Sequence, residues 1–203
     1  MKLQIPVGDF RAYLFDCDGT IADSMPLHYI AWRKALEEWN CPFDEQLFYA
    51  WGGRPPVDVV VELNRMHGLK MPVESVDAQR EKFYREFLPQ IQPVAEVLEH
   101  IDAMHRQIPF AVVSGSKRES VISSLTAVGL LDKFDLIVGS EDYTLGKPAP
   151  DAFLTAAERL GVAPAHCLVF EDTDFGIQAA TAAGMASVRV PSPLERKSEN
   201  KPR

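Results

Sequence analysis

"AYLFDCDGTIADS", residues 12–24, joins an apolar run to two aspartates that are separated by a single residue. Residues 12–16 are predicted to form a buried strand, because their apolar side chains run continuously instead of alternating with polar ones. Asp16 and Asp18 then meet at the end of that strand, where like charges repel and burial removes hydration. Gly19 follows and permits a sharp turn. A buried acidic pair of this kind predicts a positive partner nearby.

Further apolar runs resemble the first one, and helical patterns separate them. The additional predicted strands are residues 110–114, 136–139, 168–171 and 186–190. The predicted helices around them are residues 94–106, 119–128, 151–160 and 175–183. Strands that alternate with helices indicate an α/β fold, here a Rossmann-like parallel sheet with helical crossovers.

One segment breaks this alternation, because residues 24–89 show helical patterns and no convincing strand. Helical spacing is found in residues 27–39, 57–66 and 79–88, with loops expected at 41–43 and 51–56. We therefore expect an all-helical insert that forms a small second domain. Its hinges are predicted near residues 23–25 and 88–93.

The remaining residues are expected to form one discontinuous α/β core. This core comprises residues 1–23 and 90–203, and a chain of 203 residues is long enough for such a domain with an insert. The last part of the core, residues 191–203, is polar and interrupted by prolines. That composition predicts a mobile tail.

The polar residues at the strand ends predict a ligand site, because ligands of open α/β sheets bind beyond the carboxyl ends of the strands. The residues expected at this rim are Asp16, Asp18, Ser114, Lys147, Glu171 and Asp172. Four carboxylates in one cleft require a cation, and oxygen ligands without nearby His or Cys suit Mg²⁺. We expect Asp16, Asp18 and Asp172 to bind Mg²⁺. Glu171 either binds the ion itself or supports the other ligands.

The overall composition argues against several classes of partner. A net charge of −8 leaves no large basic surface for nucleic acid or an anionic membrane, although a small phosphate needs few local cations. The three cysteines show no metal-binding spacing and predict reduced thiols. The chain has no signal-peptide pattern and no apolar run near the ~20 residues of a membrane helix. We expect a cytoplasmic protein, monomeric by default, that binds neither nucleic acid nor membrane.

Four short motifs resemble those of the haloacid dehalogenase superfamily of phosphatases, in the order of that family. They are "DCDGT", "VVSGS", "GKPAPD" and "FEDTDFG", and the resemblance covers nearly the whole chain apart from the tail. The insert resembles the helical cap of the sugar-phosphatase and β-phosphoglucomutase branch. The segment "LVFEDTDFGIQAATAAGM" is especially similar to bacterial fructose-1-phosphate phosphatase-like proteins.

The resemblance implies a role for each residue at the rim. Asp16 would be the nucleophile that forms an aspartyl-phosphate, and Asp18 would first protonate the leaving alcohol and then deprotonate water. The main-chain carbonyl of Asp18 is its implied metal contact. Lys147 would neutralise charge between Asp16 and the phosphoryl group. The groups expected to hold phosphoryl oxygens are the Ser114 hydroxyl and the amides of Gly115 and Ser116.

Other candidates for substrate binding are less clearly marked. Thr20 is expected to hydrogen-bond loop, carboxylate or substrate groups. His28 matches, by resemblance, a cap histidine near the active site, with a partly exposed helix histidine as the alternative. Arg54, in "WGGRPP", would contact a sugar phosphate or decorate the surface. Arg118 would contact substrate or be solvated at a helix start. Three tryptophans, at positions 32, 39 and 51, are assigned to the core of the insert.

The resemblance predicts a Mg²⁺-dependent phosphatase for small phosphorylated sugars or sugar acids, such as fructose 1-phosphate or 6-phosphogluconate. β-Phosphoglucomutase is the alternative enzyme, although Thr20 favours hydrolysis. A non-catalytic sugar-phosphate-binding protein is the alternative from another class, and the retained acids argue against it. Asp18 argues against a dehalogenase, and the lack of lysine between Lys34 and Lys70 argues against a phosphonatase. The expected partner is a small phosphorylated metabolite whose identity the sequence leaves open.

Overall fold

The computed structural model describes residues 3–199, and its centre is a five-stranded parallel sheet. The strands are β1 Ala12–Phe15, β2 Phe110–Val113, β3 Leu136–Val138, β4 Cys167–Glu171 and β5 Ala186–Arg189. Their order is β3-β2-β1-β4-β5, and every pairing is parallel. The α/β fold predicted from the sequence is confirmed. Its central strand, β1, carries Asp16 at its carboxyl end.

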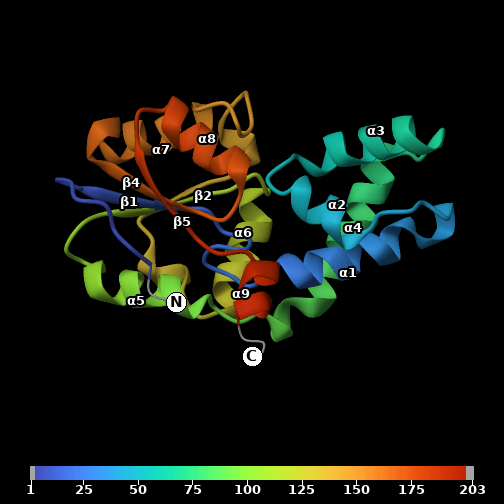
Figure 1. Ribbon diagram of the computed structural model, residues 1–203, viewed down its shortest axis with the longest axis horizontal. Coiled ribbons are helices and arrows are strands. Elements are labelled where there is room, and N and C mark those ends of the chain that lie inside the picture. Colours follow the sequence, from blue (N-terminus) through green and yellow to red (C-terminus); the bar gives the residue numbers. More distant parts are fainter. Residues whose placement is uncertain (1–2, 200–203) are drawn as a thin grey trace.

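Helices cover both faces of the sheet (Figure 1). Those of the core are α5 Ala95–Met104, α6 Arg118–Ala127, α7 Asp151–Leu160 and α8 Asp174–Ala182. Helices α5 and α6 pack on one face, and α7 and α8 pack on the other. Because side chains alternate along a strand, each strand of the sheet contributes apolar residues to both packing layers.

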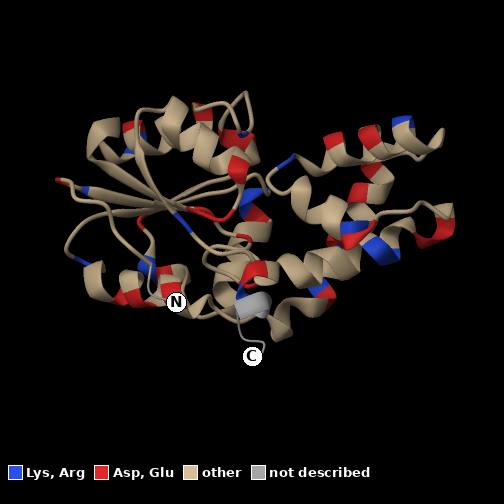
Figure 2. Cartoon of the chain, in the orientation of Figure 1, with Lys and Arg blue, Asp and Glu red and all other residues tan. Residues whose placement is uncertain are grey.

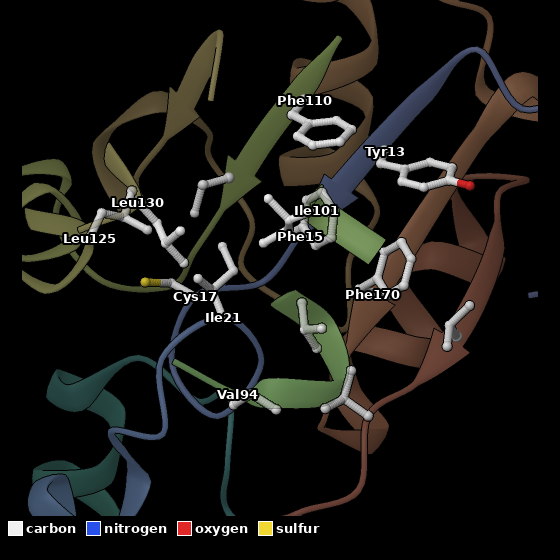
Figure 3. Close-up of a cluster of buried hydrophobic side chains, with 14 of the residues drawn as sticks. Tyr13, Phe15, Cys17, Ile21, Val94, Ile101, Phe110, Leu125, Leu130 and Phe170 are labelled. Carbon is white, nitrogen blue, oxygen red and sulfur yellow. The ribbon is translucent and has the colours of Figure 1, made fainter. Parts of the chain in front are cut away.

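The face beneath α5 and α6 is rich in aromatic side chains (Figure 3). Tyr13 and Phe15 of β1 lie beside Phe110 and Phe170 from the two neighbouring strands. The rings of Phe15 and Phe170 stack with their centroids 4.7 Å apart. Cys17 also belongs to this buried cluster. The packing therefore anchors both the end of β1 and the start of the loop that carries the acidic pair.

The helical insert lies at one side of the sheet, over the carboxyl end of β1 (Figure 1). It contains α1 Met25–Leu36, α2 Glu45–Ala50, α3 Pro56–His67 and α4 Val73–Phe87. These helices share their own apolar core, which includes Trp32, Val60 and Leu63. The two predicted domain boundaries stay predictions.

Two elements of the insert differ from the sequence prediction. Helix α4 begins six residues before the predicted start at 79, in a polar stretch of which Val76 is the buried apolar member. Helix α2 was not predicted, because six residues are too few to show a clear period. Asp44 caps it by accepting a hydrogen bond from the Leu47 amide at 2.7 Å.

Backbone hydrogen bonds hold together the two chain segments that join the insert to the core. The Asp23 amide donates to the Gln92 carbonyl at 2.8 Å, and the Val94 amide donates to the Ile21 carbonyl at 2.9 Å. An antiparallel bridge pairs Ala22 with Pro93 between these bonds. The entry and exit of the insert are therefore fixed side by side, close to the loop after β1.

The expected mobile tail, residues 191–203, contains the helix α9 Pro193–Glu199. Arg196 of this helix donates hydrogen bonds to the Asp23 carboxylate at 2.6 Å and to the Pro191 carbonyl at 2.8 Å. The sequence prediction missed this contact because 173 positions separate Arg196 from Asp23. Residues 200–203 lie outside the described residues. Within residues 3–199, no helix has the length and apolar composition that crossing a membrane requires.

Candidate active site

Three carboxylates meet at the ends of β1 and β4. The Asp16 amide donates to the Phe170 carbonyl at 3.0 Å, which keeps Asp16 in register with Glu171 and Asp172. Oxygen atoms of these three acids lie within 4.8 Å of one another, and all three residues are buried. Sheet register alone thus produces the acidic cluster, which we define as Asp16, Glu171 and Asp172.

Lys147 supplies one positive charge to the acidic cluster. Its ammonium group lies 2.6 Å from Asp16 Oδ1, 2.8 Å from Glu171 Oε2 and 3.2 Å from the Val113 carbonyl. The side chain is 2% exposed, so its three N–H donors are used within the protein. Burial lowers the pKa of Lys147, but the charges of Asp16 and Glu171 outweigh burial and raise the pKa above its usual value. Lys147 therefore stays protonated.

The acidic cluster still lacks positive charge. Burial and the neighbouring Glu171 raise the pKa of Asp16 to about 8, against the opposing effect of Lys147. Burial, Glu171 and Asp16 likewise raise the pKa of Asp172 well above its usual value. Buried carboxylate oxygens with uncompensated charge are donors of the kind that a hard divalent cation prefers. The cluster therefore fits Mg²⁺ both in charge and in ligand chemistry.

Asp18 points away from the acidic cluster, toward the helical insert. Its Oδ1 accepts a hydrogen bond from the Ser24 hydroxyl at 2.7 Å and lies 3.1 Å from His28 Nε2. Its Oδ2 accepts a hydrogen bond from the Ser116 hydroxyl at 3.0 Å. Burial raises the pKa of Asp18, but the charge of His28 and the three hydrogen bonds outweigh it and lower the pKa well below its usual value.

This orientation corrects part of the predicted metal site. Among residues 3–199, the acids close enough to share an ion are those of the acidic cluster, and the Asp18 carboxylate lies outside it. Both Asp18 oxygens are occupied by hydroxyl or imidazole partners from other segments, which the sequence could not show. The role of the Asp18 carbonyl as a metal contact stays a prediction. Thr20 reaches the cluster directly, because its hydroxyl donates to Asp172 Oδ1 at 3.3 Å.

The expected phosphate-binding loop follows β2 beside the acids. Ser114, Gly115 and Ser116 line the same cleft as Asp16 and Asp18. The Ser116 amide donates to the Ser114 hydroxyl at 3.0 Å, so it already has an acceptor within the loop. The Ser114 carbonyl accepts from the Tyr143 hydroxyl at 3.0 Å, which ties the loop to the chain after β3. The structure thus brings these predicted residues together with the two aspartates.

The opposite wall of the cleft comes from the insert and contains two arginines. Arg54 lies over the ring of Trp51, 5.0 Å from its centroid, and 5.7 Å from that of Phe175. Arg80 of α4 also lines the cleft, although sequence analysis missed it. Its side chain is only 8% exposed, and it pairs with Asp77 at 2.8 Å and Glu81 at 3.3 Å.

A sequence signal for Arg80 did exist. Arg80 follows Val76 and precedes Tyr84 at intervals of four residues, and both neighbours are buried. An arginine in the middle of the buried stripe of a helix is unusual, because a buried charge needs partners. A longer predicted α4 would have exposed this pattern.

The remaining predicted site residues divide into two groups. His28 lines the cleft and contacts Asp18. Arg118 is placed elsewhere, because its guanidinium pairs with Asp142 at 2.6 Å and it is absent from the described residues that line the cleft. Trp32 and Trp51 belong to the insert core and also line the cleft, so for them the two assignments are not exclusive.

Comparison with known proteins places these features in a family. A family model described as haloacid dehalogenase-like hydrolase matches residues 13–190. The chain belongs to the haloacid dehalogenase-like hydrolases. The matched range contains all four motifs and every predicted site residue of this hydrolase. The family resemblance found in the sequence is therefore confirmed.

Similar proteins include two named phosphatases and one mutase structure. Fructose-1-phosphate phosphatase YqaB of Escherichia coli (strain K12) is 37% identical over 188 residues, which cover 89% of this chain and 96% of the relative. The phosphorylated carbohydrates phosphatase of Thermotoga maritima is 29% identical over 182 residues, which cover 88% and 83%. The crystal structure of a β-phosphoglucomutase from Clostridium difficile aligns with a TM-score of 0.82 and 25% identity, covering 93% and 87% of the two chains.

Gly19 of this hydrolase is required by both conformation and space. Its φ is +94°, and a Cβ atom at this position would lie 2.2 Å from Asp172 Oδ2. We expect Gly19→Ala to displace Asp172 and to lower Mg²⁺ affinity and turnover by about tenfold or more. Magnesium titration followed by thermal unfolding, together with turnover, measures this effect.

Gly68→Ala is the matched control for Gly19→Ala. Gly68 also has a positive φ, +66°, but nothing lies within 4 Å of its added Cβ. This control should cost roughly 1 kcal/mol of stability from the left-handed backbone alone and leave magnesium binding unchanged. Equal magnesium affinity in the two variants would show that Gly19 does not protect the position of Asp172.

Proposed function

We propose that this chain is a Mg²⁺-dependent phosphatase that hydrolyses small phosphorylated sugars or sugar acids through an aspartyl-phosphate on Asp16. The observation that carries this proposal is the position of Asp16. Its carboxylate lies at the end of the central strand, contacts Lys147, neighbours two further acids and lines the cleft. The family match and the two phosphatase relatives support the class of phosphoric monoester hydrolase.

In the proposed reaction, a carboxylate oxygen of Asp16 attacks phosphorus, and the bond between phosphorus and the leaving alcohol oxygen breaks. Asp18 gives a proton to that oxygen, so that a neutral alcohol leaves. Asp18 then takes a proton from a water whose oxygen attacks phosphorus, which releases inorganic phosphate and restores the Asp16 carboxylate. Lys147 neutralises charge as the carboxylate and the phosphoryl group approach each other.

The environment of Asp18 supports its role in proton transfer. Its lowered pKa keeps Asp18 ionised before substrate binds. His28, 3.1 Å away, is placed to return a proton to it. The Ser24 and Ser116 hydroxyls orient the same carboxylate toward the cleft that also contains Asp16.

Asp16 and Asp172 would hold the magnesium ion. Glu171 accepts hydrogen bonds at both oxygens, from Lys147 on one side and from the Thr173 amide and hydroxyl on the other. This pattern favours a supporting position for Glu171, in which it orients Lys147. The Asp18 carbonyl is proposed as a further ligand. When bound, Mg²⁺ would neutralise charge on the phosphoryl group and within the acidic cluster.

The proposed substrate class rests on the insert wall and on the relatives. Arg54 and Arg80 offer guanidinium groups suited to hydroxyl, carboxylate or phosphate oxygens of a sugar derivative. The name of the Escherichia coli relative, at 37% identity, supports fructose 1-phosphate as the first compound to test. In the view of Figure 2, acidic and basic residues are mixed along the insert helices, which suits a small polar ligand. A cytoplasmic, monomeric protein completes the proposal.

A panel of phosphate esters with Mg²⁺ tests this function through released inorganic phosphate. The panel should contain fructose 1-phosphate, 6-phosphogluconate and glucose phosphates. Release from at least one sugar or sugar-acid ester, lost on chelation of the metal, is the expected result. No release from any ester would contradict the proposal and favour a non-catalytic binding protein.

β-Phosphoglucomutase stays the second candidate, because one solved mutase shares this fold at 25% identity. Incubation with β-glucose 1-phosphate and a trace of the bisphosphate separates the two activities. We expect inorganic phosphate to accumulate. Formation of glucose 6-phosphate without inorganic phosphate would identify a mutase instead.

Magnesium should stabilise the protein more at high pH than at low pH. The raised pKa of Asp16, about 8, exceeds the ordinary carboxyl value of about 3.9 that applies in the unfolded chain. The unfolded chain therefore binds fewer protons between these values, and this group's stabilisation is lost as the pH rises toward about 8. A bound divalent cation removes the cause of that loss.

Thermal unfolding near pH 5.5 and near pH 8, with and without Mg²⁺, measures this coupling. We expect the metal-free Tm to fall between the two pH values and the Mg²⁺-induced rise in Tm to be larger near pH 8. At a hundredfold excess over Kd the gain would be about 2.7 kcal/mol. Asp172→Asn should remove most of the gain. An equal response at both pH values would argue against magnesium binding at the acidic cluster.

A further inference from the structure

The imidazole of His28 is held between two side chains. On one edge its Nε2 atom lies 3.1 Å from Asp18 Oδ1. On its face it stacks against the ring of Tyr84, with centroids 3.8 Å apart and planes inclined by 12°. Both His28 and Tyr84 are buried. The stacked phenol therefore fixes the plane of the imidazole, and that plane directs Nε2 to Asp18.

Tyr84 is itself anchored to the α/β core. It belongs to α4 of the insert, and its hydroxyl lies 2.8 Å from the Ser124 hydroxyl of α6. The Ser124 hydroxyl in turn donates to the Ser120 carbonyl at 3.2 Å, so the Tyr84 hydroxyl donates to Ser124. Burial and the nearby charge of Asp18 raise the pKa of Tyr84, so the phenol stays neutral and keeps this donor.

Tyr84 does not belong to the described residues that line the cleft, whereas His28 and Asp18 do. Any influence of Tyr84 on the reaction must therefore pass through the residues it touches. The aromatic ring and the hydroxyl have separate parts in this arrangement. The ring supports His28, and the hydroxyl fixes the ring relative to α6.

We propose that Tyr84, anchored by Ser124, is a positioning residue that holds His28 against Asp18 and so sets Asp18 for proton transfer to the leaving oxygen. This inference rests on the proposed function, in which Asp18 is the acid. It predicts a specific defect. Loss of Tyr84 should impair the protonation of the leaving group and spare the attack of Asp16 on phosphorus.

Two classes of ester separate these effects. A sugar phosphate releases an alkoxide-like oxygen that needs a proton, whereas 4-nitrophenyl phosphate releases a stable phenolate that needs little assistance. Because general acid catalysis contributes about 10²- to 10⁴-fold, its disturbance should appear mainly with the sugar phosphate. A merely structural defect would lower turnover of both esters alike.

The experiment measures kcat and kcat/KM for both esters, with Mg²⁺, in the full chain carrying Tyr84→Leu, Tyr84→Phe or Ser124→Ala. The sugar phosphate is the best ester of the panel. Tyr84→Leu should lower its kcat by about 10- to 100-fold, and 4-nitrophenyl phosphate turnover by less than about threefold. Tyr84→Phe and Ser124→Ala remove the same hydrogen bond, so each should lower sugar-phosphate kcat by about two- to fivefold. Their double variant should be no worse than either alone.

Val76→Ala is the matched control on the same helix. Val76 is 1% exposed but packs in the core of the insert, so its loss should change stability without changing the ratio of kcat values for the two esters. If Tyr84→Leu fails to fold, the two milder variants still decide the question. Equal losses for both esters in the Tyr84 and Ser124 variants would overturn the inference alone. A wild-type chain that hydrolyses neither ester would overturn the proposed function and this inference together.

Discussion

Asp16→Asn is expected to reduce phosphate release by at least about 10⁴-fold, as the loss of a covalent nucleophile does in other enzymes. An amide oxygen has the size of the carboxylate oxygen but cannot form the phosphoryl ester at a useful rate. The substitution also removes one charge from the acidic cluster, whose members raise each other's pKa. The fold should therefore survive, with little change in Tm without metal. Phosphate release and thermal unfolding of the same preparation measure both effects.

Asp132→Asn is the control for this substitution, because Asp132 is an exposed residue outside the described lining of the cleft. It should leave turnover unchanged. Undiminished phosphate release by Asp16→Asn would remove Asp16 from the role of nucleophile. A collapsed fold in Asp16→Asn would instead indicate that the contact with Lys147 at 2.6 Å is structurally essential.

Lys147→Met should combine a loss of activity with a loss of stability. The methionine fills similar space but leaves Asp16 and Glu171 without their shared cation, and breaking a buried ion pair in this way costs about 3–5 kcal/mol. Loss of the charge beside the phosphoryl group should also lower kcat by about 10²- to 10³-fold. The stability loss should shrink at low pH, because protonation then neutralises the acids that Lys147 otherwise balances.

Lys133→Met provides the comparison for an ion pair that is not buried. Lys133 is 27% exposed and lies 3.6 Å from the exposed Asp102, so the change should cost less than about 1 kcal/mol and leave kcat unchanged. Denaturant unfolding near pH 5.5 and pH 8, with turnover, compares the two variants. If Lys147→Met were as stable and active as Lys133→Met, the charge balance described for the acidic cluster would be wrong.

The sequence was sufficient for the features that depend on local pattern. Continuous apolar runs identified all five strands, and their parallel arrangement followed from the alternation with helices. The strand ends then placed Asp16, Glu171, Asp172, Ser114 and Lys147 in one region. This worked because in a parallel sheet the carboxyl ends share one edge, so chain order alone determines which residues meet.

The features that the sequence did not reveal depend on contacts between distant segments. The orientation of Asp18 is set by Ser24, His28 and Ser116, and the last of these is 98 positions away. The Tyr84–Ser124 contact joins the insert to the core across 40 positions. No periodicity encodes such pairs. The short helix α2 and the helix α9 were missed for a related reason, because capping and tertiary contacts define them more than periodicity does.

The central claim is that Asp16 accepts the phosphoryl group in a magnesium-dependent step. Rapid acid quenching during turnover, followed by peptide mass spectrometry, locates the phosphoryl group directly. We predict one added phosphoryl group on the peptide containing Asp16, dependent on Mg²⁺ and absent from Asp16→Asn. A phosphoryl group found on another residue, such as Ser114, or formed equally well without magnesium, would contradict the account.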